Sequence, residues 1–157
     1  MNTLVRPDLI ETVKIAATSG SVKIAKATTV FGDIDPGFAK LWDNKVLDRD
    51  TEDMAVGVYQ VGGVVFNHLT LLDYVPDWNA RLMTQGQTVT FCQKYRPVMK
   101  EGVETLFPFR VHEEGSPLVA RVRKNAGLLS VKLVRLGYGQ NWKAPFNSRL
   151  AVLELDR

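Results

Sequence analysis

The residues best suited to bind a ligand are basic side chains in the C-terminal part of the chain. Arg121 and Arg123 alternate with apolar residues, and after a turn at residues 124–127 the returning segment carries Lys132. This spacing predicts two strands of a hairpin with the cations on one face. A cationic ribbon fits a groove or an open strand of nucleic acid, although outward charges that only face solvent would show the same pattern.

Residues that could support catalysis are few and scattered. His68 and His112 lie in separate predicted strands, and Cys92 is the only cysteine. The chain has no nucleophile elbow, phosphate-binding loop, dinucleotide fingerprint or zinc-protease motif. Cys92 lies in an alternating apolar segment, which predicts a buried and unreactive thiol. The sequence therefore favours a protein without catalytic activity and predicts no cofactor and no metal site.

Charge is distributed unevenly along the 157 residues. Residues 1–91 contain 8 Lys and Arg against 11 Asp and Glu, a net charge of −3, whereas residues 92–157 contain 12 against 6, a net charge of +6. A basic half favours a polyanionic partner. The length predicts one domain over residues 1–157, and the lack of a leader-like segment or a long apolar run predicts a cytoplasmic protein without membrane spans.

Alternating apolar residues and regularly spaced turn formers predict that most of the chain beyond residue 54 is β-structure. We expect strands over 55–61, 64–69, 88–95, 103–112, 118–124, 129–136 and 150–155. Residues 70–83, interrupted by Pro76, are predicted to form a loop with one helical turn around Trp78. The expected fold class is mainly β, a β-rich α+β chain with a small antiparallel barrel or a strongly curved sheet and a short helical insertion.

The N-terminal part of the chain contains two similar segments in succession. Residues 22–28 alternate and contain β-branched side chains, which predicts a strand. Residues 13–18 also alternate, but Pro7 and Asp8 before them would start a helix well, and we favour the helix over the strand.

An insertion between strands is expected over residues 36–63. Asp35 before Pro36 is typical of a helix start, and the apolar spacing that follows predicts a short amphipathic helix over 36–46. The acidic residues of 48–53 predict a solvated loop, since their spacing does not match a calcium-binding loop.

Three segments, in order along the chain, resemble the cold-shock domain, a five-stranded oligonucleotide-binding barrel. Residues 20–34 read Gly-Ser-Val-Lys-Ile-Ala-Lys-Ala-Thr-Thr-Val-Phe-Gly-Asp-Ile and are similar to its first two strands. Residues 65–72, Val-Phe-Asn-His-Leu-Thr-Leu-Leu, resemble its third strand, and residues 85–91, Gln-Gly-Gln-Thr-Val-Thr-Phe, resemble its fourth. The resemblance covers about 30 residues and implies a barrel that binds single-stranded RNA or DNA.

The resemblance also implies which residues contact the nucleic acid. In that family aromatic and histidine rings stack on unpaired bases, and lysines neutralise phosphates. The matching positions here are Lys23, Phe31, Phe66 and His68. Ile24 and Asp33 stand where the family has aromatic residues, which implies weaker binding than a full aromatic set would give. Together with the basic hairpin, these residues predict single-stranded nucleic acid as the partner. A protein partner is also possible.

Two alternatives remain. Residues 87–123 resemble the sheet of hot-dog thioesterases, whose long central helix would have to occupy 64–83, where Pro76 interrupts it, with Asp73 as the acidic catalyst. The other alternative is an interaction protein without ligand chemistry, such as an accessory factor of a phage or mobile element. Nucleic-acid binding predicts an affinity that depends steeply on salt, and a thioesterase predicts thioester hydrolysis. An interaction protein predicts neither.

Overall fold

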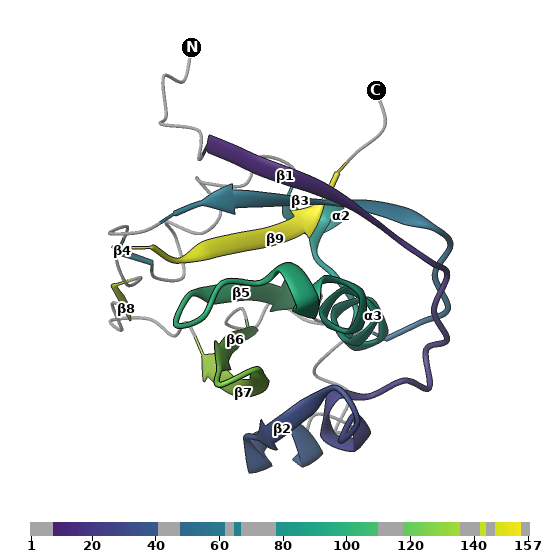
Figure 1. Cartoon of the computed structure of the whole chain (residues 1–157). Coiled ribbons are helices and arrows are strands. Elements are labelled where there is room, and N and C mark those ends of the chain that lie inside the picture. Colours follow the sequence, from purple (N-terminus) through teal and green to yellow (C-terminus); the bar gives the residue numbers. More distant parts are fainter. Residues whose placement is uncertain are drawn as a thin grey trace.

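The computed structural model describes residues 8–40, 48–61, 65–66, 78–109, 118–135, 142–143 and 147–154. Seven strands form one sheet in the order β1-β3-β9-β5-β6-β7-β2 (Figure 1). In chain order their bounds are β1 Asp8–Ile15, β2 Phe31–Ile34, β3 Met54–Gln60, β5 Glu104–Phe109, β6 Leu118–Asn125, β7 Leu128–Arg135 and β9 Arg149–Leu153. A separate two-stranded sheet pairs β4, Val65–Phe66, with β8, Trp142–Lys143.

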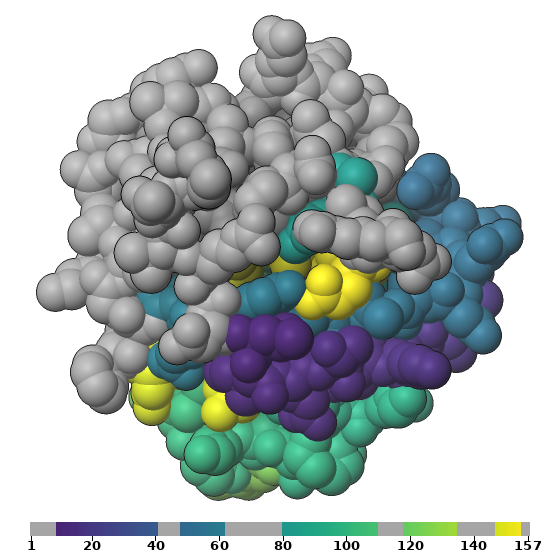
Figure 2. All heavy atoms as spheres, turned by 90° about the horizontal axis from the view of Figure 1, so that it is seen from above, coloured from purple at the N-terminus to yellow at the C-terminus, as the bar shows by residue number. Residues whose placement is uncertain are grey.

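The large sheet is open and mixed. Its end strands, β1 and β2, do not pair with each other, and β1 reaches the molecular surface beside β3 and β9 (Figure 2). Within the sheet, β2 pairs in parallel with β7, and β5 pairs in parallel with β9. All other neighbouring strands are antiparallel. The expected β-rich α+β class is therefore confirmed, while the described strands form an open sheet.

The main helix, α3 (Gln85–Tyr95), occupies the segment for which we predicted a strand over 88–95, so that prediction was wrong. A capping box starts the helix: Thr84 Oγ1 accepts a hydrogen bond from the Gln87 N–H at 3.1 Å, and Gln87 Oε1 accepts one from the Thr84 N–H at 3.0 Å. Eight of its eleven residues are buried. A helix buried on several sides also carries apolar residues at alternate positions, which explains the mistaken strand.

The hydrophobic core lies between α3 and the concave side of the sheet, which curves from β1 to β2 around the helix (Figure 1). The Phe91 ring on α3 lies 5.3 Å from the Phe107 ring on β5, centroid to centroid. Ile15 on β1, Phe31 on β2 and residues of every other strand in the sheet join the same cluster. The curvature thus gives the sheet a buried concave face and sends alternate side chains to the opposite face.

Two predictions in the N-terminal part were wrong. The segment 13–18, for which we favoured a helix, contains the end of β1, residues 13–15, which pairs antiparallel with β3, and an isolated bridge from Thr18 to Thr51. The segment 22–28 is not a strand but contains a 3₁₀ turn, Ile24–Lys26. A hydrogen bond holds this turn against the start of α3: the Ile24 N–H donates to Gln85 Oε1 at 3.0 Å. Tertiary pairing decided both segments, because local propensity was equivocal.

Other predicted elements are confirmed where they are described. The five strands β3, β5, β6, β7 and β9 match their predicted segments to within a few residues, and a helical turn, α2 (Trp78–Arg81), includes Trp78. Of the predicted helix 36–46, residues Pro36–Lys40 form a 3₁₀ helix, and 41–46 lie outside the described residues. A further 3₁₀ turn, Arg96–Val98, follows α3. Within the described ranges no helix is long and apolar enough to cross a membrane.

Candidate nucleic-acid interface

The β6–β7 hairpin brings three of the predicted binding residues together. Arg121 on β6 stands directly opposite Lys132 on β7, and Arg123 stands opposite Ser130. Directly opposed side chains on an antiparallel pair are neighbours, with Cβ atoms about 5 Å apart. The intervening residues of both strands are buried in the core, so these cations project from the convex face.

The hairpin has a tight turn that fixes this register. Ala126 and Gly127 have φ angles of 51° and 79°, as the mirror-image turns of two-residue hairpins require. The Gly127 N–H donates to Glu101 Oε1 at 2.8 Å. Since a slip of one residue would exchange the two faces of each strand, the turn determines that the cations face outward.

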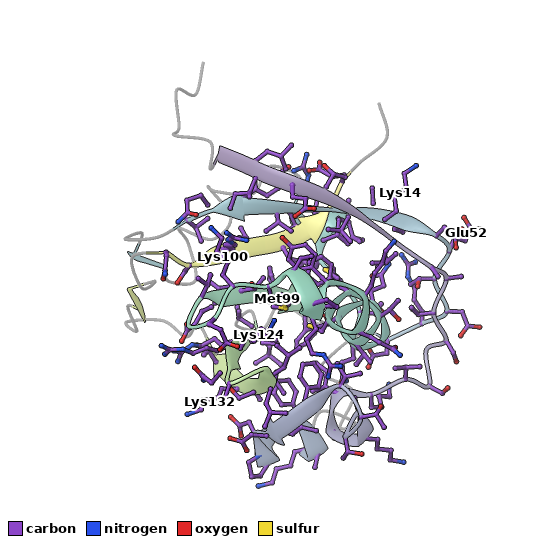
Figure 3. All side chains as sticks on the ribbon, viewed as in Figure 1. Lys14, Glu52, Met99, Lys100, Lys124 and Lys132 are labelled. Carbon is purple, nitrogen blue, oxygen red and sulfur yellow. The ribbon has the colours of Figure 1, made fainter. Side chains whose placement is uncertain are left out.

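The three cations differ in how they are held. Arg123 and Lys132 are exposed, and Figure 3 shows Lys132 on the side of β7 away from α3. Arg121 is half-buried and makes a two-point contact with Glu104 on β5, with Nη2–Oε1 at 2.6 Å and Nε–Oε2 at 3.1 Å. Glu104 is only 5% exposed. This geometry holds the Arg121 guanidinium in one orientation. We call Arg121, Arg123 and Lys132 the basic strand face.

Lys124, between these residues in sequence, belongs to the opposite face. Its Nζ donates to the carbonyl oxygens of Arg96 at 2.9 Å and Met99 at 3.2 Å, just beyond the end of α3. A cation at that position is favourable, because the C-terminal end of a helix carries a partial negative charge. Lys124 therefore ties the hairpin to the helix.

Two residues implied by the cold-shock resemblance lie away from this face. Lys23 forms an ion pair with Asp48 at 2.7 Å, and the same carboxylate accepts hydrogen bonds from the Gln85 backbone and side chain at the start of α3. Phe31 is 2% exposed and packs in the core, which leaves its ring no free face for a base. Asp48, expected in a solvated loop, is thus a buried partner of the helix start.

The remaining predicted residues are described only in part. The backbone of Phe66 pairs with Trp142 in the small sheet, and its side chain lies outside the described residues, as does His68. The basic strand face is therefore the part of the predicted site that the structure brings together.

The neighbours of the basic strand face were not predicted from the sequence. Leu128 and Ser130 precede Lys132 on the same face of β7, and Asp33 on β2 stands next to Ser130. Their positions follow from the two-residue period of a strand, but the parallel pairing of β2 with β7 has no local signal. Asp33 is exposed and places a negative charge at the edge of the face.

Asp35, at the end of β2, helps to hold that edge strand. Its carboxylate accepts hydrogen bonds from the Leu133 N–H at 3.0 Å and the Gly37 N–H at 2.9 Å. These two backbone donors lower the pKa of Asp35 below its usual value. The carboxylate therefore stays ionised and anchors β2 beside the hairpin.

A cavity of about 540 Å³ lies elsewhere, at the end of the β1–β3 pair. Most of its charged groups already have partners: Lys94 donates to the Lys14 carbonyl, Asp53 accepts from the Ala17 N–H, and Glu154 accepts from the Tyr59 hydroxyl. In the described part of the chain no three His, Cys, Asp or Glu side chains are grouped as metal ligands would be. The basic strand face is the stronger candidate site.

Comparison with family models, with curated proteins and with solved structures found no match for this chain.

Proposed function

We propose that the protein binds single-stranded nucleic acid through the basic strand face. The observation that carries this proposal is the cross-strand pairing of Arg121 with Lys132, with Arg123 next to them, on the face opposite the core. Two cations along β6 and a third beside them on β7 provide neighbouring contacts for the phosphates of a polyanion. The net charge of +6 in residues 92–157 supports the same partner.

The shape of the face favours a single strand over a duplex. Sheet faces are a common platform for single-stranded RNA and DNA, whereas duplex readout needs a helix or ribbon that enters a groove. β6 and β7 lie within a seven-stranded sheet and do not project from it as a free ribbon. Arg121 and Arg123, two positions apart on one strand, are separated by roughly 6.6 Å along the chain axis, which suits an extended backbone.

Two acidic groups limit the expected affinity. Glu104 neutralises part of the charge of Arg121 while it fixes the orientation of the guanidinium. Asp33 adds a negative charge at the margin and repels phosphate. We therefore expect binding at low salt that weakens steeply as salt rises.

The test is a titration of fluorescent single-stranded DNA and RNA, and of a duplex of the same length, at two salt concentrations. Arg123→Ala and Lys132→Ala should each weaken binding and reduce the salt slope by about 0.7, the value per phosphate contact on a single strand. Lys26→Ala is the matched control, because Lys26 is an exposed lysine on the 3₁₀ turn before β2. Its affinity should equal that of the parent protein.

Failure of the parent protein to bind any single strand at low salt would refute the proposal. Equal losses in the Lys26→Ala control would refute the assignment to the basic strand face. Tighter binding of the duplex than of the single strand would refute the preference for an open strand.

A thioesterase of the hot-dog type is the second candidate, favoured by one observation. The helix α3 lies on the concave side of a curved sheet, as a central helix of that class would. It occupies residues 85–95, however, most of which the resemblance assigned to the sheet, and not 64–83. Its expected catalyst, Asp73, lies outside the described residues. Because one architecture serves many functions, this likeness alone assigns no activity. Hydrolysis of acyl-thioesters, measured by the free thiol that the reaction releases, would support this activity against nucleic-acid binding.

A further inference from the structure

The basic strand face ends at an unusually exposed apolar residue. Leu128, the first residue of β7, is 62% exposed and stands opposite Asn125 at the hairpin end. It lies on the same strand face as Ser130 and Lys132, and diagonally across from Arg123. An apolar side chain thus borders the basic strand face.

The neighbouring strand leaves this leucine uncovered. Gly32 lies at the irregularity in β2, where the pairing with β7 shifts register. A Cβ atom at Gly32 would lie 3.5 Å from the Leu128 Cβ and 3.6 Å from its Cδ1, in ordinary contact. Because glycine has no side chain, the backbone of β2 borders Leu128 without rising over it. The Leu128 side chain is therefore left exposed at the end of the basic strand face, where the adjacent strand does not cover it.

We infer that Leu128 is the base-contacting residue of this site. The inference rests on the proposed function and extends it from phosphate contacts to base contacts. Unpaired bases are flat and apolar on both faces, and in nucleic-acid-binding proteins they stack on aromatic side chains beside cations. An exposed leucine offers a smaller apolar surface for the same contact. The partner is therefore a single strand whose phosphates contact Arg123 and Lys132 while one base covers Leu128.

This arrangement explains how the face distinguishes classes of polyanion. In a duplex the bases are stacked on each other, so none is free to cover Leu128. A chain of phosphates without bases can contact only the cations. Leu128 should therefore contribute to binding only when an unpaired base is present.

The experiment compares a fluorescent oligothymidine with an abasic oligonucleotide of the same length, at low salt. Leu128→Ser should weaken oligothymidine binding by about 2- to 5-fold, less than the loss of a base stacked on an aromatic ring, and leave abasic binding unchanged. Leu128→Trp should strengthen oligothymidine binding and leave abasic binding unchanged, because a larger ring gives a larger contact. Leu128 is exposed, so neither variant should alter the melting temperature beyond a few degrees.

Val98→Ser is the matched control, since Val98 is 61% exposed and lies on the 3₁₀ turn after α3. It should leave both affinities unchanged. If neither oligonucleotide binds the parent protein, the proposed function itself fails. If both bind and Leu128→Ser changes neither affinity, or changes both equally, the phosphate contacts stand and the role of Leu128 is refuted.

Discussion

Arg121 and Arg123 carry the same charge but have different structural roles. The Arg121 guanidinium is bound at two points by Glu104, whose side chain is 6% exposed, whereas Arg123 extends from the same strand into solvent. A buried carboxylate needs its partner, because desolvation without a cation is costly. Loss of Arg121 therefore affects both folding and binding, and Arg123 and Lys132 are the cleaner probes of binding.

Arg121→Ala should lower the free energy of unfolding by roughly 1–3 kcal/mol, the cost of a buried acceptor that loses its partner. Arg123→Ala should change it by less than about 0.5 kcal/mol, as expected for a surface side chain. Urea unfolding of the two variants measures the difference. Partial recovery of stability when Glu104→Gln is added to Arg121→Ala would confirm the cause, and equal stabilities of the two single variants would contradict it.

Cys92 is the buried residue whose chemistry is most open to direct test. The thiol is fully buried in the core beside Phe91, as the sequence predicted, and burial raises its pKa. The thiolate is the reactive form, so a neutral buried thiol should react slowly. The native protein should resist a thiol reagent at pH 8 over the time in which the urea-unfolded chain reacts fully. Rapid labelling of the native protein would show that the core opens.

At the scale of single elements, α3 is fixed at its start by a local capping box and at both ends by contacts from distant segments. Thr84 and Gln87 form the capping box at its start, and Asp48 accepts the Gln85 N–H there at 2.9 Å. Lys124 from the hairpin satisfies carbonyls beyond its end. The helix therefore couples the position of the basic strand face to the core.

Thr84→Ala should destabilise the protein by about 1 kcal/mol, the usual cost of removing an N-cap side chain. The Gln87 N–H loses its acceptor, and the reciprocal contact from Gln87 loses its geometry. Denaturant unfolding measures the change, with Thr29→Ala as control because Thr29 is exposed in a turn. A control variant as destabilised as Thr84→Ala would show that the cap is not the cause.

At the scale of the whole molecule, tyrosine hydroxyls join segments that are far apart in the sequence. Tyr95 at the end of α3 donates to Glu11 Oε2 on the edge strand β1 at 2.6 Å. Tyr59 on β3 donates to Glu154, just after β9. Burial, together with the hydrogen bond to each carboxylate, raises the pKa of Tyr95 and of Tyr59 to about 12.

These raised values predict a loss of stability in alkali. The folded pKa lies above the usual value of about 10, so the neutral phenols stabilise the native state fully below pH 10. That stability should be lost as the pH rises from 10 towards 12. Melting temperatures at pH 8, 10 and 11 measure the effect, and Tyr95→Phe should show a shallower decline. An equally steep decline in that variant would exclude Tyr95 as a cause.

The sequence by itself determined the part of the molecule that local patterns control. The segments of β6 and β7 alternate in part, those of β3, β5 and β9 are short apolar runs, and turn residues lie between most of these segments, so their existence followed from local patterns. A two-residue period placed Arg121, Arg123 and Lys132 on one face, because Gly127 closes a hairpin of defined register. The basic strand face was thus predictable before any long-range contact was known.

The tertiary structure alone decided which segments are buried and what they pair with. Residues 85–95 are helical because burial on several sides, added to the local capping box of Thr84 and Gln87, outweighs an alternating pattern. Phe31 occupies the core because β2 pairs in parallel with β7, about a hundred residues later in the chain. Local propensities differ by about 1 kcal/mol or less per residue, whereas burial of one large side chain contributes about 1.5–3 kcal/mol. Where the two conflict, long-range packing determines the structure.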